Sequence, residues 1–241
     1  MTTGKRACIF GASGGVGRAL VEALAASGEY ARIYACSRAG SPFSMPSVVA
    51  LTFDLTNQAS IAAVAAEIAL EGALDLVIVA TGILHRPGTI GPEKSASALD
   101  PEVMAEVFAL NTIGPALIGK HLLPLLSRHG AVFAVLSARV GSIEDNRLGG
   151  WHSYRASKAA LNMLVRNFAI ETARRNPLAV IVALHPGTVA TSLSEPFQRN
   201  VTHGALQSPN QSAGHLLTVI GGLTPGESGG FYAWDGEAIP F

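Results

Sequence analysis

Short apolar runs alternate with helix-like stretches along the whole of this 241-residue chain. Each run is apolar on both faces, which is typical of strands in a parallel sheet that is covered by helices on both sides. The runs lie at residues 6–12, 31–37, 48–56, 74–82, 131–138, 178–187 and 229–236. Crossovers between such strands are right-handed. The sequence therefore predicts an α/β fold with one doubly wound parallel sheet of about seven strands.

Helical periodicity fills most of the gaps between these runs. The predicted helices span residues 17–30, 57–72, 100–128, 151–175 and 208–223. Thr56 or Asn57 is expected to cap the second helix, and the third is expected to bend or break near Gly114 and Pro115. No linker or repeat divides the chain, so residues 1–241 are interpreted as a single domain of the Rossmann kind.

Two stretches rich in Gly, Pro and Ser, 38–47 and 185–210, are predicted to be loops. A loop as long as the second one is usually a functional lid in a compact domain. Residues 188–210 are therefore expected to cover a site. Their apolar members are Leu193, Phe197, Val201 and Leu206.

Charge is scarce: 14% of residues are charged, 49% are hydrophobic, and the formal net charge is zero. Because a typical chain is about one quarter charged, we expect helix faces to be buried in a homo-oligomer, either a dimer or a tetramer. No basic run indicates a nucleic-acid or membrane partner, and no apolar run is long enough to span a membrane. The two cysteines and seven histidines lack ligand spacing, so no metal site is predicted. A cytoplasmic location is expected in the absence of targeting signals.

A glycine-rich loop follows the first predicted strand. It contains Gly11, Gly14, Gly15 and Gly17, spaced G-x-x-x-G-x-G from Gly11, and it also includes Ser13 and Val16. Glycines allow a tight turn and let a pyrophosphate approach backbone N–H groups at the positive end of a helix. At the first strand-to-helix turn of an alternating chain, this loop predicts a dinucleotide site.

The end of the second predicted strand indicates which dinucleotide is bound. A carboxylate at this place would hold a ribose 2′-hydroxyl, whereas an arginine accommodates a 2′-phosphate. The chain has Ser37 and Arg38 here and no acidic residue nearby. We therefore expect NADP(H), with Ser37 and Arg38 on the phosphate.

A tyrosine and a lysine stand four positions apart at the start of the fourth predicted helix. Tyr154 and Lys158 share a helix face at this spacing, with Ala156, Ala159 and Ala160 leaving room beside them. Alone, the pair would be an ordinary surface tyrosine near a solvated lysine. Its position downstream of a predicted dinucleotide site favours a functional role.

These motifs together resemble the short-chain dehydrogenase/reductase family, from Ala7 to about Gly236. The glycine loop matches the family motif T-G-x-x-x-G-x-G with Phe10 in place of threonine, and "YRASK" matches Y-x-x-x-K. "LNTIG", "FDLT" and "HPGTVAT" match further family segments in the same order. The wording around "GSIEDNRLGGWHSYRASKAALNM" looks most like the branch of C-factor-like proteins and sniffer-type carbonyl reductases.

The resemblance implies a role for each matched residue. Tyr154 would be the general acid, Lys158 would lower the pKa of Tyr154 and bind the nicotinamide ribose, and Asn111 would hold a water of a proton relay. Pro186 and Gly187 would turn the chain across the nicotinamide. The implied cofactor-binding set is Gly11, Ser13, Gly14, Gly15, Val16, Gly17, Ser37, Arg38, Asp54, Leu55, Ala80, Thr81, Gly82, Tyr154, Lys158, Pro186, Gly187, Val189 and Thr191.

Two departures from the family pattern stand out. The usual N-N-A-G segment is replaced by residues 79–82, "VATG". The substrate-polarising serine usually lies three residues before a glycine, yet that position before Gly141 is Ala138. Ser137 is the first candidate for this role and Ser142 the second, and a third alternative is that no serine performs it.

The sequence thus predicts an NADP-dependent oxidoreductase acting on a small to medium apolar carbonyl compound or secondary alcohol, with Tyr154, Lys158, Ser137 and Asn111 as catalytic residues. The alternative is a C-factor-like signalling or regulatory protein that binds a dinucleotide with little turnover. A racemase or dehydratase that keeps its nicotinamide bound is a third alternative, since fold alone does not decide between functions.

Overall fold

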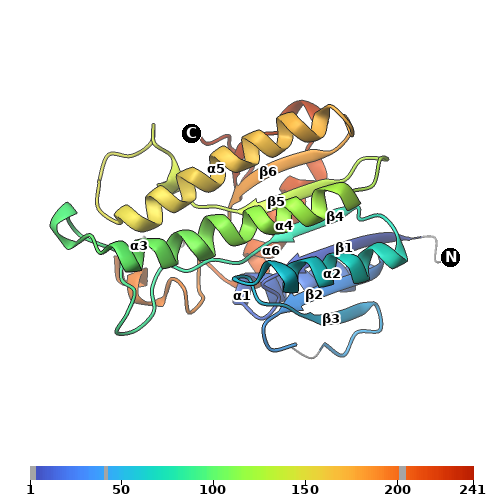
Figure 1. Cartoon of the computed structure of the whole chain (residues 1–241), viewed down its shortest axis with the longest axis horizontal. Coiled ribbons are helices and arrows are strands. Elements are labelled where there is room, and N and C mark those ends of the chain that lie inside the picture. The colour runs from blue at the N-terminus through green and yellow to red at the C-terminus, as the bar shows by residue number, and fades with distance from the viewer. Residues whose placement is uncertain (1–3, 41–42, 201–204) are drawn as a thin grey trace.

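The computed structural model describes residues 4–40, 43–200 and 205–241. Its seven-stranded parallel sheet has the order β3-β2-β1-β4-β5-β6-β9. The strands are β1 (Lys5–Phe10), β2 (Tyr30–Ser37), β3 (Val48–Thr52), β4 (Leu76–Val79), β5 (Val132–Leu136), β6 (Val180–His185) and β9 (Phe231–Ala233). The predicted doubly wound sheet is confirmed (Figure 1). Several strands end earlier than their apolar runs, because the chain leaves the sheet there to form the loops described below.

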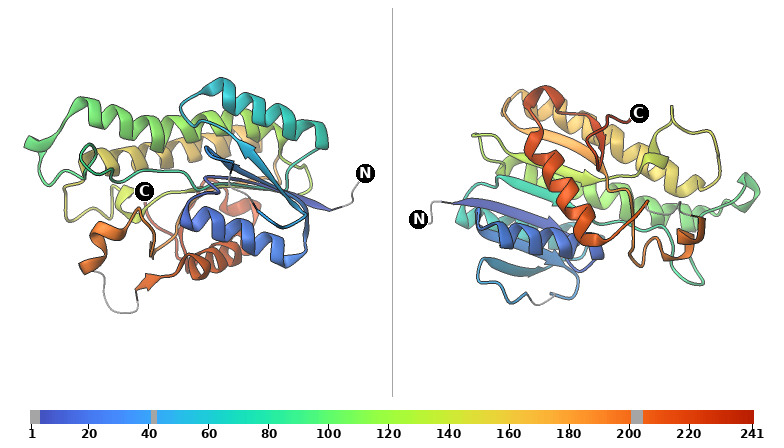
Figure 2. Two further views of the ribbon diagram at one scale, coloured as in Figure 1. Left: turned by 90° about the horizontal axis from the view of Figure 1, so that it is seen from below. Right: turned by 180° about the vertical axis from the view of Figure 1, so that it is seen from behind.

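Helices cover both faces of the sheet, as the alternation predicted. One face carries α1 (Gly15–Ser27) and α6 (Pro209–Gly222), which pack on each other and are best seen from behind (Figure 2). The other carries α2 (Gln58–Glu71), α4 (Gly114–Leu122) and α5 (His152–Ala173). Successive residues of a strand therefore enter different cores: Phe133 and Val135 pack toward α4 and α5, and Ala134 and Leu136 pack toward α1 and α6.

Local capping explains where the helices begin. The Asn57 side chain accepts hydrogen bonds from the N–H groups of Ala59 and Ser60, so Asn57 rather than Thr56 is the cap of α2. Asp100 caps α3 (Pro101–Phe108), with proline at the first helical position. Ser208 and Gln211 form a reciprocal capping box at α6.

The long helix predicted over residues 100–128 is interrupted, although not at the proline. A π-helical turn, Ala109–Ile113, separates α3 from α4, and Gly114 and Pro115 form the first turn of α4. Proline needs no N–H partner in a first turn. Single π-helical turns of this kind occur frequently at functional sites.

The predicted lid after β6 contains more regular structure than its sequence indicated. β7 (Thr188–Val189) pairs in parallel with β8 (Leu206–Gln207), and a 3-10 helix spans Glu195–Asn200. Val201, one of the predicted lid residues, lies outside the described residues. Among the helices that the structure describes, none is long and apolar enough to cross a membrane.

Candidate active site

The strand order reverses between β1 and β4, so the chain leaves these neighbouring strands toward opposite faces. Ligands of open α/β sheets bind in the crevice outside the carboxyl ends of the strands at such a reversal. The segments that follow β1, β4, β5 and β6 meet there, and α5 runs alongside (Figure 1). The residues predicted from sequence come from these segments.

The glycine loop is built by close backbone contacts that exclude side chains. Gly11 has φ of +87°, and a Cβ on it would lie 2.9 Å from the carbonyl of Ala80 after β4. A Cβ on Gly17 would collide with the carbonyl oxygen of Gly11. Gly14 caps α1 without any side-chain hydrogen bond, so the N–H groups of the first turn of α1, around Val16, lack a side-chain acceptor.

The chain after β6 returns to this loop. The Thr191 methyl group packs on Gly15, where a Cβ would lie 2.6 Å from it. Gly187 has φ of +78° and lies against Gln207 and Trp234, while the Pro186 carbonyl accepts a hydrogen bond from Ser212. Val189 is buried, and its carbonyl accepts the N–H of Thr191. Of the predicted cofactor residues after β6, Thr191 therefore lies beside the glycine loop, and Pro186, Gly187 and Val189 lie on the segment that leads to it.

The ends of β2 and β3 carry the groups expected to select the dinucleotide. Ser37 is buried, whereas Arg38 is exposed. The pKa of the exposed Asp54 carboxyl lies below its ordinary value, chiefly because Thr56 donates hydrogen bonds to it and in smaller part through the charge of Arg38. The Leu55 side chain is buried against Gly114, and its expected contact with the cofactor stays a prediction.

The segment after β4 forms the centre of the crevice. The Ala80 N–H donates to the carbonyl of Phe10, and the buried hydroxyl of Thr81 has no hydrogen-bond partner in the part of the chain that the structure describes. Gly82 is exposed, and a Cβ on it would lie 3.4 Å from Asn111 Oδ1 and 3.5 Å from Lys158 Nζ. The structure thus brings Gly82, Asn111 and Lys158 together.

Lys158 is 3% exposed, which is rare for a lysine. Its ammonium donates a 2.9 Å hydrogen bond to the carbonyl of Leu136 at the end of β5. A Cβ on Gly141 would lie 2.6 Å from the Lys158 Cβ, so glycine is required for α5 to approach this closely. Burial disfavours the charged form and lowers the pKa of Lys158 to about 8.

Tyr154 is also buried, and Lys158 Nζ lies 5.9 Å from the centroid of its ring. Burial raises the pKa of the Tyr154 phenol above its ordinary value, so the protein environment favours the protonated form. Lys158 is expected from the sequence to lower this pKa, whereas in the described chain the pKa is shifted by burial, which raises it. Within the described residues, the Tyr154 hydroxyl has no hydrogen-bond partner.

Asn111 lies in the π-helical turn and is fully buried. Its side chain binds Ile83 twice: Oδ1 accepts the Ile83 N–H at 2.7 Å, and Nδ2 donates to the Ile83 carbonyl at 2.9 Å. Nδ2 also donates to Ser157 Oγ on α5. Asn111 therefore ties the segment after β4 to the helix that carries Tyr154 and Lys158.

The two candidate serines are both engaged within the protein. Ser137 is 4% exposed and donates a 2.7 Å hydrogen bond to Asn162 Oδ1 on α5. Ser142 is buried, and its hydroxyl accepts the N–H of Asp145. Ala138 is only half-buried. Because the Ser137 hydroxyl points to α5, its predicted role on a substrate carbonyl stays a prediction that requires this hydrogen bond to break.

Sequence reasoning missed a buried carboxylate that caps α5. Glu93, 6% exposed, accepts hydrogen bonds from the N–H and hydroxyl of Ser153. Burial alone would raise the Glu93 pKa, but these hydrogen bonds outweigh it and the pKa lies below its ordinary value. Glu93 comes from a loop 60 residues earlier, so no local spacing could have indicated the contact.

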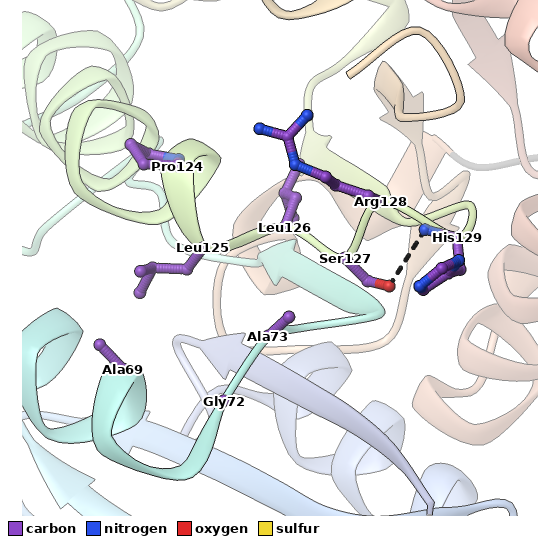
Figure 3. Close-up of a pocket in the computed structure, with 9 residues that line it drawn as sticks. All are labelled: Ala69, Gly72, Ala73, Pro124, Leu125, Leu126, Ser127, Arg128 and His129. Carbon is purple, nitrogen blue, oxygen red and sulfur yellow. Dashed lines mark hydrogen bonds between the residues drawn. The ribbon is translucent and has the colours of Figure 1, made fainter. Parts of the chain in front are cut away.

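A hollow of about 460 Å³ lies away from these residues (Figure 3). It is lined by residues that precede β4 and β5, including Gly72, Ala73 and Arg128. These residues lie at the amino ends of the strands, opposite the edge where Tyr154 and Lys158 meet. The chemistry described above therefore does not involve this hollow.

The family can now be stated. The model of the short chain dehydrogenase family matches residues 5–202, and the chain belongs to this family of oxidoreductases. It is 33% identical over 233 residues to 1-hydroxy-2-glutathionyl-2-methyl-3-butene dehydrogenase of Rhodococcus sp. (strain AD45), covering 96% of this chain and 97% of that one. It is 36% identical over 161 residues to C-signal of Myxococcus xanthus, covering 66% of this chain and 91% of that one.

Solved structures agree with this assignment. The NADPH-bound carbonyl reductase from chicken fatty liver superposes with a TM-score of 0.85 at 28% identity, covering 99% of each chain. The carbonyl reductase Sniffer of D. melanogaster superposes with a TM-score of 0.84 at 23% identity, covering 99% of this chain and 100% of that one. The second similarity bears on the fold alone. The resemblance inferred from the sequence motifs is confirmed.

The Ser137–Asn162 contact leads to a prediction. Ser137→Ala should lower the free energy of unfolding by about 1–3 kcal/mol, because Asn162 Oδ1 loses its buried donor. Urea unfolding of the variant and the wild type measures the difference. Ser142→Ala is the matched control, and its loss should be smaller because its hydrogen-bond partner Asp145 is an exposed residue. Unchanged stability in Ser137→Ala would show that this hydrogen bond is unimportant.

Proposed function

We propose that this chain is an NADP-dependent oxidoreductase that transfers hydride between nicotinamide and a small to medium apolar carbonyl compound or the corresponding secondary alcohol. The observation that carries the proposal is the buried Lys158 ammonium, which lies beside the Tyr154 ring, Gly82 and Asn111 at the carboxyl edge of the sheet. The names of relatives support it: one is an alcohol-oxidising dehydrogenase by its name, and one solved relative is an NADPH-bound carbonyl reductase.

The residues at this edge fit a dinucleotide. The first turn of α1 lacks a side-chain cap, which suits a pyrophosphate, and Gly11 and Gly17 let the loop before it pack closely against the Ala80 carbonyl and on itself. Arg38 is exposed at the end of β2, where a 2′-phosphate is expected, and the buried Thr81 hydroxyl after β4 has no partner among the described residues. When bound, NADPH supplies the hydride.

The residues of this chain supply the proton and control its transfer. Tyr154 keeps its phenolic proton at neutral pH because burial disfavours the phenolate. Tyr154 Oη would donate this proton to the substrate's carbonyl oxygen as negative charge develops on that oxygen. The Lys158 ammonium stabilises the phenolate that remains. Asn111 holds the segment after β4 against α5 during this step.

An alternative function rests on the similarity to C-signal, which extends over 66% of this chain. A dinucleotide-binding signalling protein would need the glycine loop. It would not need a buried ammonium beside a buried phenol, because such a pair is expensive to desolvate. The arrangement of Tyr154 and Lys158 therefore favours the enzyme, and NADPH oxidation measured with a panel of carbonyl compounds distinguishes the two functions.

Cofactor preference is the next prediction. NADPH should bind at least about tenfold more tightly than NADH, which corresponds to roughly 1.4 kcal/mol and is modest for a charge-assisted contact. Arg38→Ala should remove most of this preference while leaving NADH affinity nearly unchanged. Fluorescence titration of both dinucleotides measures it. Equal affinities in the wild type would contradict the NADP assignment.

Tyr154→Phe tests the proton donor. It removes one hydroxyl, so the fold and NADPH affinity should persist while kcat falls by about 10²–10⁴-fold. Stopped-flow or steady-state NADPH oxidation measures kcat, and NADPH titration provides the control. Lys158→Ala should weaken both NADPH binding and turnover. If Tyr154→Phe retains full turnover, the proposed mechanism is wrong.

The pH profile of the wild type serves as a second control for this experiment. The Lys158 ammonium loses its proton as pH rises through about 8, whereas the Tyr154 phenol stays protonated well above that pH. The free-enzyme profile of kcat/KM for reduction should therefore descend from about pH 8 upward. A descending limb that appears only above about pH 10, the ordinary pKa of tyrosine, would assign the titration to Tyr154 instead.

We also propose a homo-oligomer, a dimer or a tetramer, formed through the exposed side of the helices that carry the site. Ile113 just before α4, and Met163 and Ile170 on α5, are 53%, 61% and 48% exposed. Met163 and Ile170 are seven residues apart and share a helix face. Light scattering should give a mass at least twice 24.9 kDa, and Met163→Glu with Ile170→Glu should reduce it to 24.9 kDa. A wild-type monomer at micromolar concentration would refute this.

A further inference from the structure

Trp151 has an unusual backbone conformation next to Tyr154. It is the one non-glycine residue with positive φ in the described chain, at 51°. A bulky residue in this left-handed region is strained, and such strain persists only where surrounding contacts enforce it. Gly149 and Gly150 precede it and also have positive φ, at 62° and 65°. Trp151 is therefore strained at a position where glycine would fit without strain.

Glu93 supplies the contacts that hold Trp151. The Trp151 N–H donates to the Glu93 carbonyl oxygen, and the Glu93 carboxylate binds the N–H and hydroxyl of Ser153 two residues later. A Cβ on Gly150 would lie 3.3 Å from the same Glu93 carbonyl oxygen. One buried residue therefore fixes the strained turn and the start of α5 together.

The ring of Trp151 lies between the proton donor and the lid. Its centroid is 6.3 Å from that of Tyr154, at an interplanar angle of 73°. It is 5.0 Å from the ring of Phe197 in the lid, at 56°. The centroid of the His85 ring lies 5.8 Å from that of Phe197. His85 Nε2 also forms a 2.8 Å hydrogen bond with the carbonyl of Ser192 in the lid. Three rings from three separate segments thus form a continuous wall beside Tyr154.

Two charged groups beside this wall are engaged within the protein. Arg155 donates from its guanidinium to the carbonyls of Gly150 and Val140, and the Glu93 carboxylate is bound by Ser153. The wall therefore presents ring faces and edges. Aromatic rings pack favourably against other rings in offset and edge-to-face geometries, as these three already do.

We propose that Trp151 and Phe197 determine substrate specificity by binding a flat, uncharged aryl group attached to the substrate carbonyl, and that Glu93 is a positioning residue for Trp151. The inference rests on the proposed function, because it places the substrate carbonyl at Tyr154. It narrows the apolar carbonyl compounds of that proposal to those that carry an aromatic ring.

The test compares acetophenone with 2-butanone in the full-length protein at saturating NADPH. Trp151→Gly removes the ring and relieves the strained φ, so the wall is lost while the turn is not destabilised. The ratio of kcat/KM for acetophenone to that for 2-butanone should fall by about 10–100-fold, chiefly through the KM of acetophenone. Trp151→Phe should restore most of the ratio. Phe197→Ala should lower it in the same direction.

Two controls separate specificity from folding. Leu148→Gly removes an exposed apolar side chain from the same loop and should leave the ratio unchanged. Glu93→Gln should raise the KM of acetophenone with little change in kcat, which is a split that general destabilisation would not produce. An unchanged ratio in Trp151→Gly, or a loss equal to that in Leu148→Gly, would overturn the proposal.

A binding measurement keeps this result distinct from a failure of the proposed function. If the wild type reduces neither ketone, the oxidoreductase proposal fails, and the wall is then tested with benzamide, which is not reduced. Binding of benzamide to the NADP⁺-loaded protein, followed by the shift in Tm, should weaken at least about tenfold in Trp151→Gly. Equal binding by the two proteins would overturn the proposal on the wall.

Discussion

The buried ammonium of Lys158 is the constraint around which the rest of the site is arranged. Within the described residues no carboxylate pairs with it, and its hydrogen bond goes to the neutral carbonyl of Leu136. A buried charge with so little compensation is costly, and the pKa of about 8 expresses that cost. Glycine is needed at 141, because a Cβ there would lie 2.6 Å from the Lys158 Cβ. The close approach of α5 that buries the lysine therefore requires glycine in the segment after β5.

The interruption of the long helix serves the same arrangement. A regular α-helix through residues 109–113 would rotate every later side chain relative to the π-helical turn that is present. The wide turn directs Asn111 at the backbone of Ile83 and at Ser157, while Thr112 donates to the Ser157 carbonyl. Two adjacent side chains thus bind α5 at one residue, directly before Lys158. The position of the Lys158 ammonium therefore depends on the π-helical turn as well as on α5.

Local signals in the sequence predicted much of this, and long-range packing accounts for the remainder. The alternating pattern, the Asn57 cap and the glycine loop depend on near neighbours, so spacing and residue type were sufficient. The π-helical turn has no such signal. Pro115 suggested a break in the helix at its own position, but it lies within the first turn of α4. The Leu55 side chain packs against Gly114, a contact between distant parts of the sequence that the motif around Leu55 could not indicate. The contact of Glu93 with Ser153 joins residues 60 apart and is visible only in three dimensions.

The alternation of side chains along β5 explains which hydroxyl remains available for catalysis. Phe133, Val135 and Ser137 alternate with residues of the other face, so Ser137 continues the row that packs toward α5 and meets Asn162 there. A shift of one residue would have turned it toward the crevice, where Ala138 is half-buried. Ser142 is engaged by Asp145. Of the three hydroxyls that the sequence proposed for catalysis, Tyr154 alone has no hydrogen-bond partner within the described chain, and it is also the one beside the ammonium. Tyr154 is thus the hydroxyl that remains available as proton donor, because the protein already engages the two serines.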